Sequence, residues 1–180
     1  MRRVCFHGAE STGKSVLAKK LSRELGLPWV PEYGRGYCEA KFASGPVELD
    51  MDDLLAIAGG QDAMMASAAA SAPPLLILDT DPLMTAAWAQ MVFGRIPPAL
   101  FSFEKAEHYL VFAADVPWVA DGSRFFGAPL ERARFAAVAE DVLVRAGFDV
   151  EWWDNNTGHK DVADRVRACW IAGIRVAGDG

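Results

Sequence analysis

The segment that most constrains this chain is Gly8-Ala9-Glu10-Ser11-Thr12-Gly13-Lys14-Ser15, which fits the pattern G-x-x-x-x-G-K-[ST]. A short β-prone run, residues 3–6, comes before it, and apolar residues at helical spacing come after it. Glycines let such a loop wrap closely around a phosphate, so that backbone N–H groups and the N-terminus of the following helix point at the anion. The pattern therefore predicts a phosphate-binding loop, or P-loop, whose residues bind a nucleoside triphosphate.

Two side chains of this loop have specific predicted roles. The Lys14 ammonium group is expected to reach the β- and γ-phosphates and so to take part in catalysis. The Ser15 hydroxyl is expected to be a ligand of Mg²⁺. A nucleoside triphosphate and Mg²⁺ are therefore the cofactors that the sequence predicts, and the loop by itself leaves the choice between ATP and GTP open.

The composition argues against several classes of protein. The chain has 180 residues, 52% of them hydrophobic and 23% charged, which is typical of one globular domain, here residues 1–180. A net charge of −6 without a run of like charges argues against a dedicated nucleic-acid or membrane-surface binder, and no segment is apolar over a membrane-spanning length. The three cysteines show neither a disulfide framework nor metal-binding spacing, so we expect a cytoplasmic protein. Nothing in the composition indicates the number of subunits.

Strand-like and helix-like segments alternate along the chain. The expected strands are short apolar runs at residues 3–6, 29–31, 75–78, 108–112 and 148–152. The expected helices cover residues 14–25, about 50–72, 83–93, 129–145 and 159–174, with a shorter one at 99–105. Residues 33–42 are expected to form a helix or an irregular turn. This alternation predicts an α/β fold, in which helices cover both faces of a parallel sheet.

Two aspartates follow the most apolar of these strands, residues 75–78. Ligands of open α/β sheets bind at the carboxyl ends of the strands, so Asp79 is expected to orient Mg²⁺, directly or through water. An ordinary turn or helix cap is the alternative for Asp79. Asp81 precedes Pro82, and the sequence leaves two roles open for it: cap of the next helix or contact with the acceptor substrate.

Glu32, Tyr33 and Arg35 begin where the second expected strand ends, on the same rim as the P-loop. We therefore expect them on the acceptor side of the site. The Glu32 carboxylate is suited to take a proton from an attacking hydroxyl or to orient that hydroxyl, and Arg35 to bind a substrate or phosphate oxygen. The alternative is a surface ion pair between Glu32 and Arg35.

A candidate lid follows the fourth expected strand, at about residues 116–132. Arg124 lies in its glycine-containing part, and Arg132 lies at its end. Arginines on such a segment suit closure over ATP, where Arg124 would neutralise charge in the transition state. A solvated basic face of the following helix is the alternative.

Three further residues are candidates for the acceptor pocket. Trp88 and Trp118 offer flat surfaces on which a planar base stacks, although tryptophans in such positions more often belong to the core. Gln61 lies among apolar helical positions, where it either binds a substrate amide or hydroxyl or is solvated.

The ordered set of segments is more specific than the P-loop alone. After the P-loop come Pro31-Glu32-Tyr33-Gly34-Arg35, Gly60-Gln61, Asp79-Thr80-Asp81-Pro82, Trp88, Phe93-Gly94, and residues 115–124 with the letters DVPWVADGSR. In this order they resemble the ribosylnicotinamide kinase domain of NadR-type proteins, a branch of the P-loop kinases. The resemblance covers about residues 3–172.

The resemblance implies a P-loop kinase fold with five parallel strands and a mobile lid. It also implies ATP-dependent phosphorylation of the 5′-hydroxyl of nicotinamide riboside, which gives nicotinamide mononucleotide. By the same resemblance, Glu32 takes the position of the base or hydroxyl-orienting carboxylate, Asp79 that of the Walker B aspartate, and Arg124 that of the lid arginine. The H-x-G-H stretch of the adenylyltransferase domain in bifunctional members does not occur here, so we expect the activity to stop at the mononucleotide.

Two other hypotheses stay open at this point. One is the same chemistry on another nucleoside or on a small alcohol. The other is a nucleotide-dependent switch, a protein that hydrolyses ATP without an acceptor and whose output is contact with a protein partner.

Overall fold

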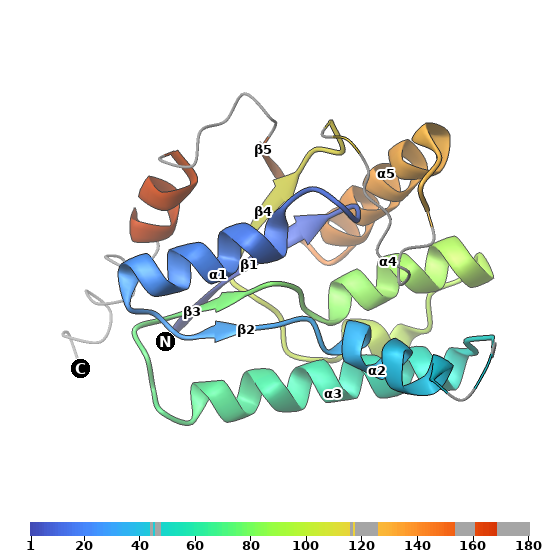
Figure 1. Cartoon of the computed structure of the whole chain (residues 1–180), viewed down its shortest axis with the longest axis horizontal. Coiled ribbons are helices and arrows are strands. Elements are labelled where there is room, and N and C mark those ends of the chain that lie inside the picture. Colours follow the sequence, from blue (N-terminus) through green and yellow to red (C-terminus); the bar gives the residue numbers. More distant parts are fainter. Residues whose placement is uncertain (44, 46–47, 116, 118–125, 154–160, 169–180) are drawn as a thin grey trace.

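The computed structural model describes residues 1–43, 45, 48–115, 117, 126–153 and 161–168 (Figure 1). Within these residues, a five-stranded sheet in the order β2-β3-β1-β4-β5 forms the centre, and every neighbouring pair of strands is parallel. The strands are β1 (Arg2–Gly8), β2 (Trp29–Val30), β3 (Leu75–Leu78), β4 (His108–Phe112) and β5 (Glu151–Trp153). The parallel α/β architecture expected from the sequence is confirmed.

Helices connect the strands, and most lie where the sequence predicts them. They are α1 (Lys14–Leu25), α2 (Tyr33–Phe42), α3 (Met51–Ala69), α4 (Pro82–Phe93) and α5 (Pro129–Arg145), and residues 161–168 are also helical. The expected helix at 99–105 is instead a 3₁₀ turn, η1 (Pro98–Phe101), and the last strand is shorter and later than expected. No helix in the described part of the chain is long and apolar enough to cross a membrane.

The two faces of the sheet pack against different helices. Side chains alternate along β1, so Val4 and Phe6 join a cluster with α1 and the helix at 161–168, whereas Cys5 joins the larger cluster with α3, α4 and α5. All residues of β3 are buried, as expected for an inner strand of a parallel sheet. Helices thus cover both faces (Figure 1).

The transition from β1 to the P-loop depends on a glycine. Gly8 has a φ of 121°, and a Cβ atom at this position would lie 2.6 Å from the backbone oxygen of Phe112 on the neighbouring strand. Only glycine adopts this backbone conformation at such a close approach without strain. The chain therefore turns directly from the end of β1 toward α1, which places the N-terminus of α1 at the carboxyl edge of the sheet.

Candidate active site

A cleft opens at the carboxyl edge of the sheet, and segments far apart in the sequence line it. The P-loop contributes one part of its lining, and the segments that follow β2 and β3 contribute Glu32, Arg35, Asp79 and Thr80. Another part is apolar and includes Leu49, Leu54, Ile57, Met84, Trp88, Val92, Phe93 and Phe135. These segments meet because parallel strands bring their carboxyl ends to the same edge.

Lys14 lies over the P-loop. Its ammonium group donates hydrogen bonds to the backbone oxygens of Gly8 (2.9 Å) and Ala9 (2.5 Å) and to the Thr12 hydroxyl (3.2 Å). Burial lowers the pKa of this ammonium group, and nearby carboxylates oppose the shift. A bound phosphate would offer charged oxygens in place of these neutral acceptors, and charge-assisted hydrogen bonds are the stronger ones.

Ser15 and Asp79 meet where α1 begins. The Ser15 hydroxyl hydrogen-bonds to the Asp79 carboxylate, which follows β3 and is only 4% exposed. Burial raises the pKa of Asp79, while the hydrogen bond from Ser15 and the charges of Lys14 and Arg35 lower it. A hydroxyl and a carboxylate beside a triphosphate loop are oxygen ligands of the kind that Mg²⁺ prefers. The pair therefore fits the predicted metal position.

Glu32 and Arg35 both line the cleft, at the junction between β2 and α2. The Arg35 Nη2 atom lies 4.0 Å from Glu32 Oε2, and about a third of each side chain is exposed (39% and 33%). Burial raises the pKa of the Glu32 carboxyl, and the negative charge of Asp79 raises it further, whereas Lys14 and Arg35 lower it. The two residues thus form an ion pair inside the cleft rather than an isolated pair on the outer surface.

Trp88 lines the cleft and also packs among other aromatic rings; that a base stacks on it stays a prediction. It lies on α4 and lines the apolar part of the cleft. Its ring also packs against Phe126 and Phe135, with ring centroids 5.2 Å apart in both pairs. The aromatic neighbours hold the indole in place, and the indole forms part of the cleft wall.

Gln61 lines the cleft, but its amide is engaged inside the protein. It is 2% exposed, and its amide bonds to backbone groups. Its Oε1 atom accepts a hydrogen bond from Tyr33 N (2.8 Å), and its Nε2 atom donates to the oxygens of Pro31 (3.3 Å) and Thr80 (3.2 Å). The alternative of a solvated side chain is wrong, because Gln61 is buried. The contact with substrate stays a prediction, since Gln61 lines the cleft while its amide bonds to backbone groups.

Asp81 does not line the cleft and is fully buried. Its carboxylate accepts hydrogen bonds from Leu83 N (3.0 Å), Ala106 N (3.3 Å) and the Tyr109 hydroxyl. The bond from Leu83 N caps the start of α4. Of the two roles predicted for Asp81, the helix cap is correct and the contact with the acceptor is wrong.

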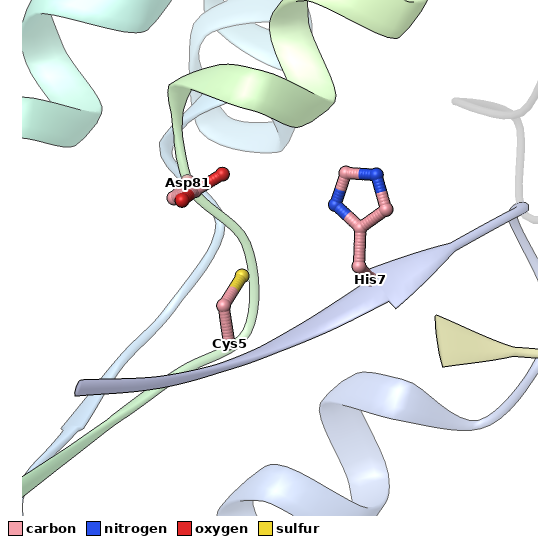
Figure 2. A group of neighbouring side chains, drawn as sticks. All are labelled: Cys5, His7 and Asp81. Atoms are coloured by element: carbon pink, nitrogen blue, oxygen red, sulfur yellow. The ribbon is translucent and has the colours of Figure 1, made fainter. Parts of the chain in front are cut away.

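Figure 2 shows Asp81 together with Cys5 and His7 of β1. All three are buried, and their possible metal-ligand atoms lie within 4.8 Å of one another, the one such group found among the described residues. The His7 Nε2 atom hydrogen-bonds to the Ala139 oxygen (3.1 Å), and burial lowers the pKa of His7 to about 3, so the ring is neutral. The Asp81 oxygens already accept three hydrogen bonds, whereas the buried His7 Nδ1 atom has no hydrogen-bond partner among the described residues.

Five more of the predicted site residues are not placed in the cleft. Ala9 is the one residue of the P-loop that is absent from the lining, because it is buried. Tyr33 packs its ring beside Gly60, outside the lining, so the predicted contact of Tyr33 with the acceptor stays a prediction. Arg132 lies in the first turn of α5, is 8% exposed and does not line the cleft either. Arg124 and Trp118 lie outside the described residues, as does most of the predicted lid.

Other cleft residues were missed in the sequence. Cys38 and Thr85 are examples, and both follow from helical spacing: Cys38 lies three residues after Arg35, and Thr85 three residues before Trp88. Phe135 also lines the cleft. It comes from α5, and no local pattern connects that helix with this edge of the sheet.

A comparison with models of protein families shows which family the chain belongs to. The model of the family AAA_28, described as AAA domain, matches residues 3–160, which is most of the chain. The chain belongs to this family. The matched part of the AAA domain contains the P-loop, Glu32, Asp79 and all other described residues of the cleft.

Curated relatives connect this AAA domain with NadR. It is 30% identical over 146 residues to the trifunctional NAD biosynthesis/regulator protein NadR of Escherichia coli (strain K12), and equally to that of Salmonella typhimurium (strain LT2). The match covers 79% of the chain but 36% of each relative, so the chain spans about a third of the length of these proteins. The expected homology to the ribosylnicotinamide kinase region of NadR is confirmed.

Solved structures agree on the fold. A NadR protein in complex with NR superposes with a TM-score of 0.76 at 24% identity, over 93% of this chain and 50% of that one. NadR in complex with NAD and AMP-PNP gives 0.74 at 24% identity, over 94% and 49%. Thymidylate kinase from Ehrlichia chaffeensis gives 0.63 at 12% identity, over 98% of both chains. These likenesses show an α/β, P-loop kinase-like fold.

Proposed function

We propose that this AAA domain transfers the γ-phosphoryl group of ATP to the 5′-hydroxyl of nicotinamide riboside and releases nicotinamide mononucleotide. The observation that carries the proposal is that one cleft joins the P-loop and the Ser15–Asp79 pair to Glu32 and Arg35. Homology to NadR supports phosphoryl transfer, and the complexes of NadR with NR and with AMP-PNP support this choice of acceptor and donor.

The P-loop forms the donor side. Its backbone N–H groups and the N-terminus of α1 would surround the β-phosphate, as in other loops of this pattern. The Lys14 ammonium would exchange its contacts with loop oxygens for the β- and γ-phosphate oxygens. Ser15 and Asp79 would hold Mg²⁺, which supplies positive charge to the phosphate oxygens when it is bound.

Glu32 and Arg35 form the acceptor side. The 5′-oxygen attacks the γ-phosphorus, the bond from that phosphorus to the β,γ-bridging oxygen breaks, and ADP leaves. Glu32 orients the attacking hydroxyl and accepts its proton, a task for which its raised pKa suits it. Arg35 binds an oxygen of the acceptor or of the phosphoryl group and keeps Glu32 in place.

The apolar part of the cleft is proposed to bind the base. The pyridinium ring of nicotinamide riboside is flat and positively charged, and the face of a tryptophan attracts such a ring. Trp88 offers that face, and Phe126 and Phe135 hold its indole. The lid with Arg124 stays a prediction, in which the arginine neutralises charge on the phosphoryl group in transit.

The decisive experiment measures ADP release from Mg-ATP in the presence of a panel of nucleosides and of small alcohols, with the product identified by mass. Strong stimulation by nicotinamide riboside alone supports the proposal. Stimulation by another nucleoside alone would leave the chemistry intact and refute the acceptor. Turnover that needs no acceptor would indicate a switch or ATPase and refute the kinase. A Lys14→Met variant reports contaminating activity.

A further inference from the structure

Gln61 does not take part in the chemistry proposed above, yet it holds the chain on both sides of Glu32. Its Oε1 atom accepts from Tyr33 N, the residue after Glu32, and its Nε2 atom donates to the oxygen of Pro31, the residue before it. These two bonds tie the backbone on both sides of Glu32 to α3.

The same amide holds the chain next to Asp79. Its Nε2 atom also donates to the oxygen of Thr80, the residue that follows this carboxylate. Gln61 therefore connects the segment after β2 with the segment after β3, and it is the carboxyl-terminal ends of these two strands that carry the acceptor-side and metal-side carboxylates.

The reason for such a connection lies in how β2 and β3 separate. Their ladder ends with the hydrogen bond from Asp79 N to the Val30 oxygen (3.0 Å). Pro31 has no N–H group, so it cannot donate the next hydrogen bond of the ladder. The carbonyl groups of Pro31 and Thr80, just beyond the ladder, both need a donor. The NH₂ group of Gln61 has two hydrogens and serves both carbonyls. The side chain thus replaces the ladder where the strands diverge.

We propose that Gln61 is a positioning residue, which sets the distance between Glu32 and Asp79 by clamping the diverging ends of β2 and β3. The proposal rests on the proposed function, since it concerns the two carboxylates of that reaction. Gln61 is among the residues that line the cleft, but its amide is 2% exposed and has its bonds within the protein, so the proposed action is through the backbone.

Loss of the clamp has an electrostatic consequence at Glu32. The charged groups that face this carboxyl are Asp79 and Glu10, which raise its pKa, and Lys14 and Arg35, which lower it, while burial raises it most. When the strand ends separate, Glu32 becomes less buried and moves away from Asp79 and Lys14 alike, whose effects on its pKa oppose each other. Burial is the largest cause of the raised pKa, so its loss lowers the pKa of Glu32, and the acid side of the rate profile should move to lower pH.

The test compares Gln61→Met with Gln90→Met. Methionine keeps the length of glutamine and removes every hydrogen bond of the side chain, and Gln90 is a control glutamine on α4 outside the cleft lining.

We measure kcat and KM over a range of pH. We also titrate Glu32 by NMR in protein with ¹³C-labelled glutamate, using Glu32→Gln to assign its signal. We expect kcat of Gln61→Met to fall about tenfold to a hundredfold, the scale of a small misplacement of reacting groups. The KM for ATP should stay near that of the wild type, and the titration of Glu32 should move to lower pH.

Two outcomes overturn the proposal. One is a folded Gln61→Met variant with the kcat and the Glu32 titration of the wild type. The other is a Gln61→Met variant that melts at a lower temperature while its kcat and its Glu32 titration stay unchanged. If Gln61→Met does not fold, Gln61→Glu decides, because its carboxylate accepts from Tyr33 N but cannot donate to Pro31 and Thr80. In that variant, an unchanged kcat overturns the proposal.

The NMR titration separates this proposal from the proposed function, since it needs no acceptor. If the wild type does not phosphorylate nicotinamide riboside but Gln61→Met still shifts the titration of Glu32, the acceptor is wrong and the clamp stands. If the wild type is active and Gln61→Met equals it, only the clamp is wrong.

Discussion

Both carboxylate oxygens of Asp53 accept hydrogen bonds from the ammonium group of Lys41, and this contact ties α2 to α3. The Tyr37 hydroxyl also donates to Asp53 (2.8 Å), and Asp53 and Asp50 form the capping box that starts α3. Because α2 begins directly after Glu32, the network holds the acceptor side of the cleft against the rest of the molecule.

The first prediction concerns the stability that this contact provides. Lys41→Met leaves the buried Asp53 carboxylate without its cation, which should lower the free energy of unfolding by about 1–2 kcal/mol. Lys20→Met is the matched control: Lys20 pairs with Glu24 at 3.9 Å on the exposed surface of α1 and should change little. Urea denaturation at neutral pH measures both. Equal effects of the two substitutions would contradict the prediction.

The second prediction concerns how the stability that Asp53 provides depends on pH. The hydrogen bond from Lys41 and that from the Asp50 backbone lower the pKa of Asp53 to about 2, from an ordinary 3.8. A carboxyl with a lowered folded-state pKa stabilises the fold above 3.8, and that contribution, about 2 kcal/mol, is lost as the pH falls through 2. The stability difference between wild type and Asp53→Asn, measured by urea denaturation, should therefore shrink from pH 6 toward pH 3. A difference that is independent of pH would show that Asp53 acts through packing alone.

The third prediction concerns the role of Glu32. Glu32→Gln should lower kcat about a hundredfold, the scale of lost general-base help, while ATP binding persists. Because Glu32 has a raised pKa, the wild-type rate should fall on the acid side at a pH above the ordinary carboxyl range, and this limb should vanish in the variant. Glu39→Gln, an exposed position on the same helix, is the control. A nearly unchanged kcat would mean that Glu32 is structural.

The fourth prediction concerns the metal. Asp79→Asn removes the charge of the carboxylate that Ser15 contacts, so half-maximal rate should need about tenfold more free Mg²⁺. The measurement is the initial rate at fixed ATP over a series of Mg²⁺ concentrations. Asp141→Asn, at an exposed carboxylate on α5, should leave the curve unchanged. The same Mg²⁺ dependence in wild type and Asp79→Asn would remove Asp79 from the metal position.

The fifth prediction compares two adjacent glycines of α3. A Cβ at Gly60 would lie 2.3 Å from a ring atom of Tyr33, whereas a Cβ at Gly59 meets no atom within 4 Å. Gly59→Ala should stabilise the protein by roughly 0.5–1 kcal/mol through helix propensity, and Gly60→Ala should lose that gain and more as the ring is displaced. Melting temperatures of the wild type and the two variants give the order of their stabilities. If Tyr33→Ala does not restore the gain in the Gly60→Ala background, the clash is not the cause.

The sequence determined the P-loop, the parallel α/β sheet and two of the carboxylates in the cleft. These follow from local rules: glycines permit the loop, apolar runs form the strands, and parallel strands deliver the residues that follow them to one edge. Glu32 and Asp79 could therefore be placed beside the P-loop without a structure, because each directly follows a strand or its final proline.

Only the tertiary structure decided what the other polar residues near that edge do. A polar side chain there can bond outward to a ligand or inward to backbone groups, and the sequence pattern is the same in both cases. Asp81 turns inward because a helix start and the Tyr109 hydroxyl need its oxygens, and Gln61 does so because two strand ends diverge and leave carbonyls without donors. Most of these partners come from other segments of the chain, so folding had to bring them together before either role was fixed.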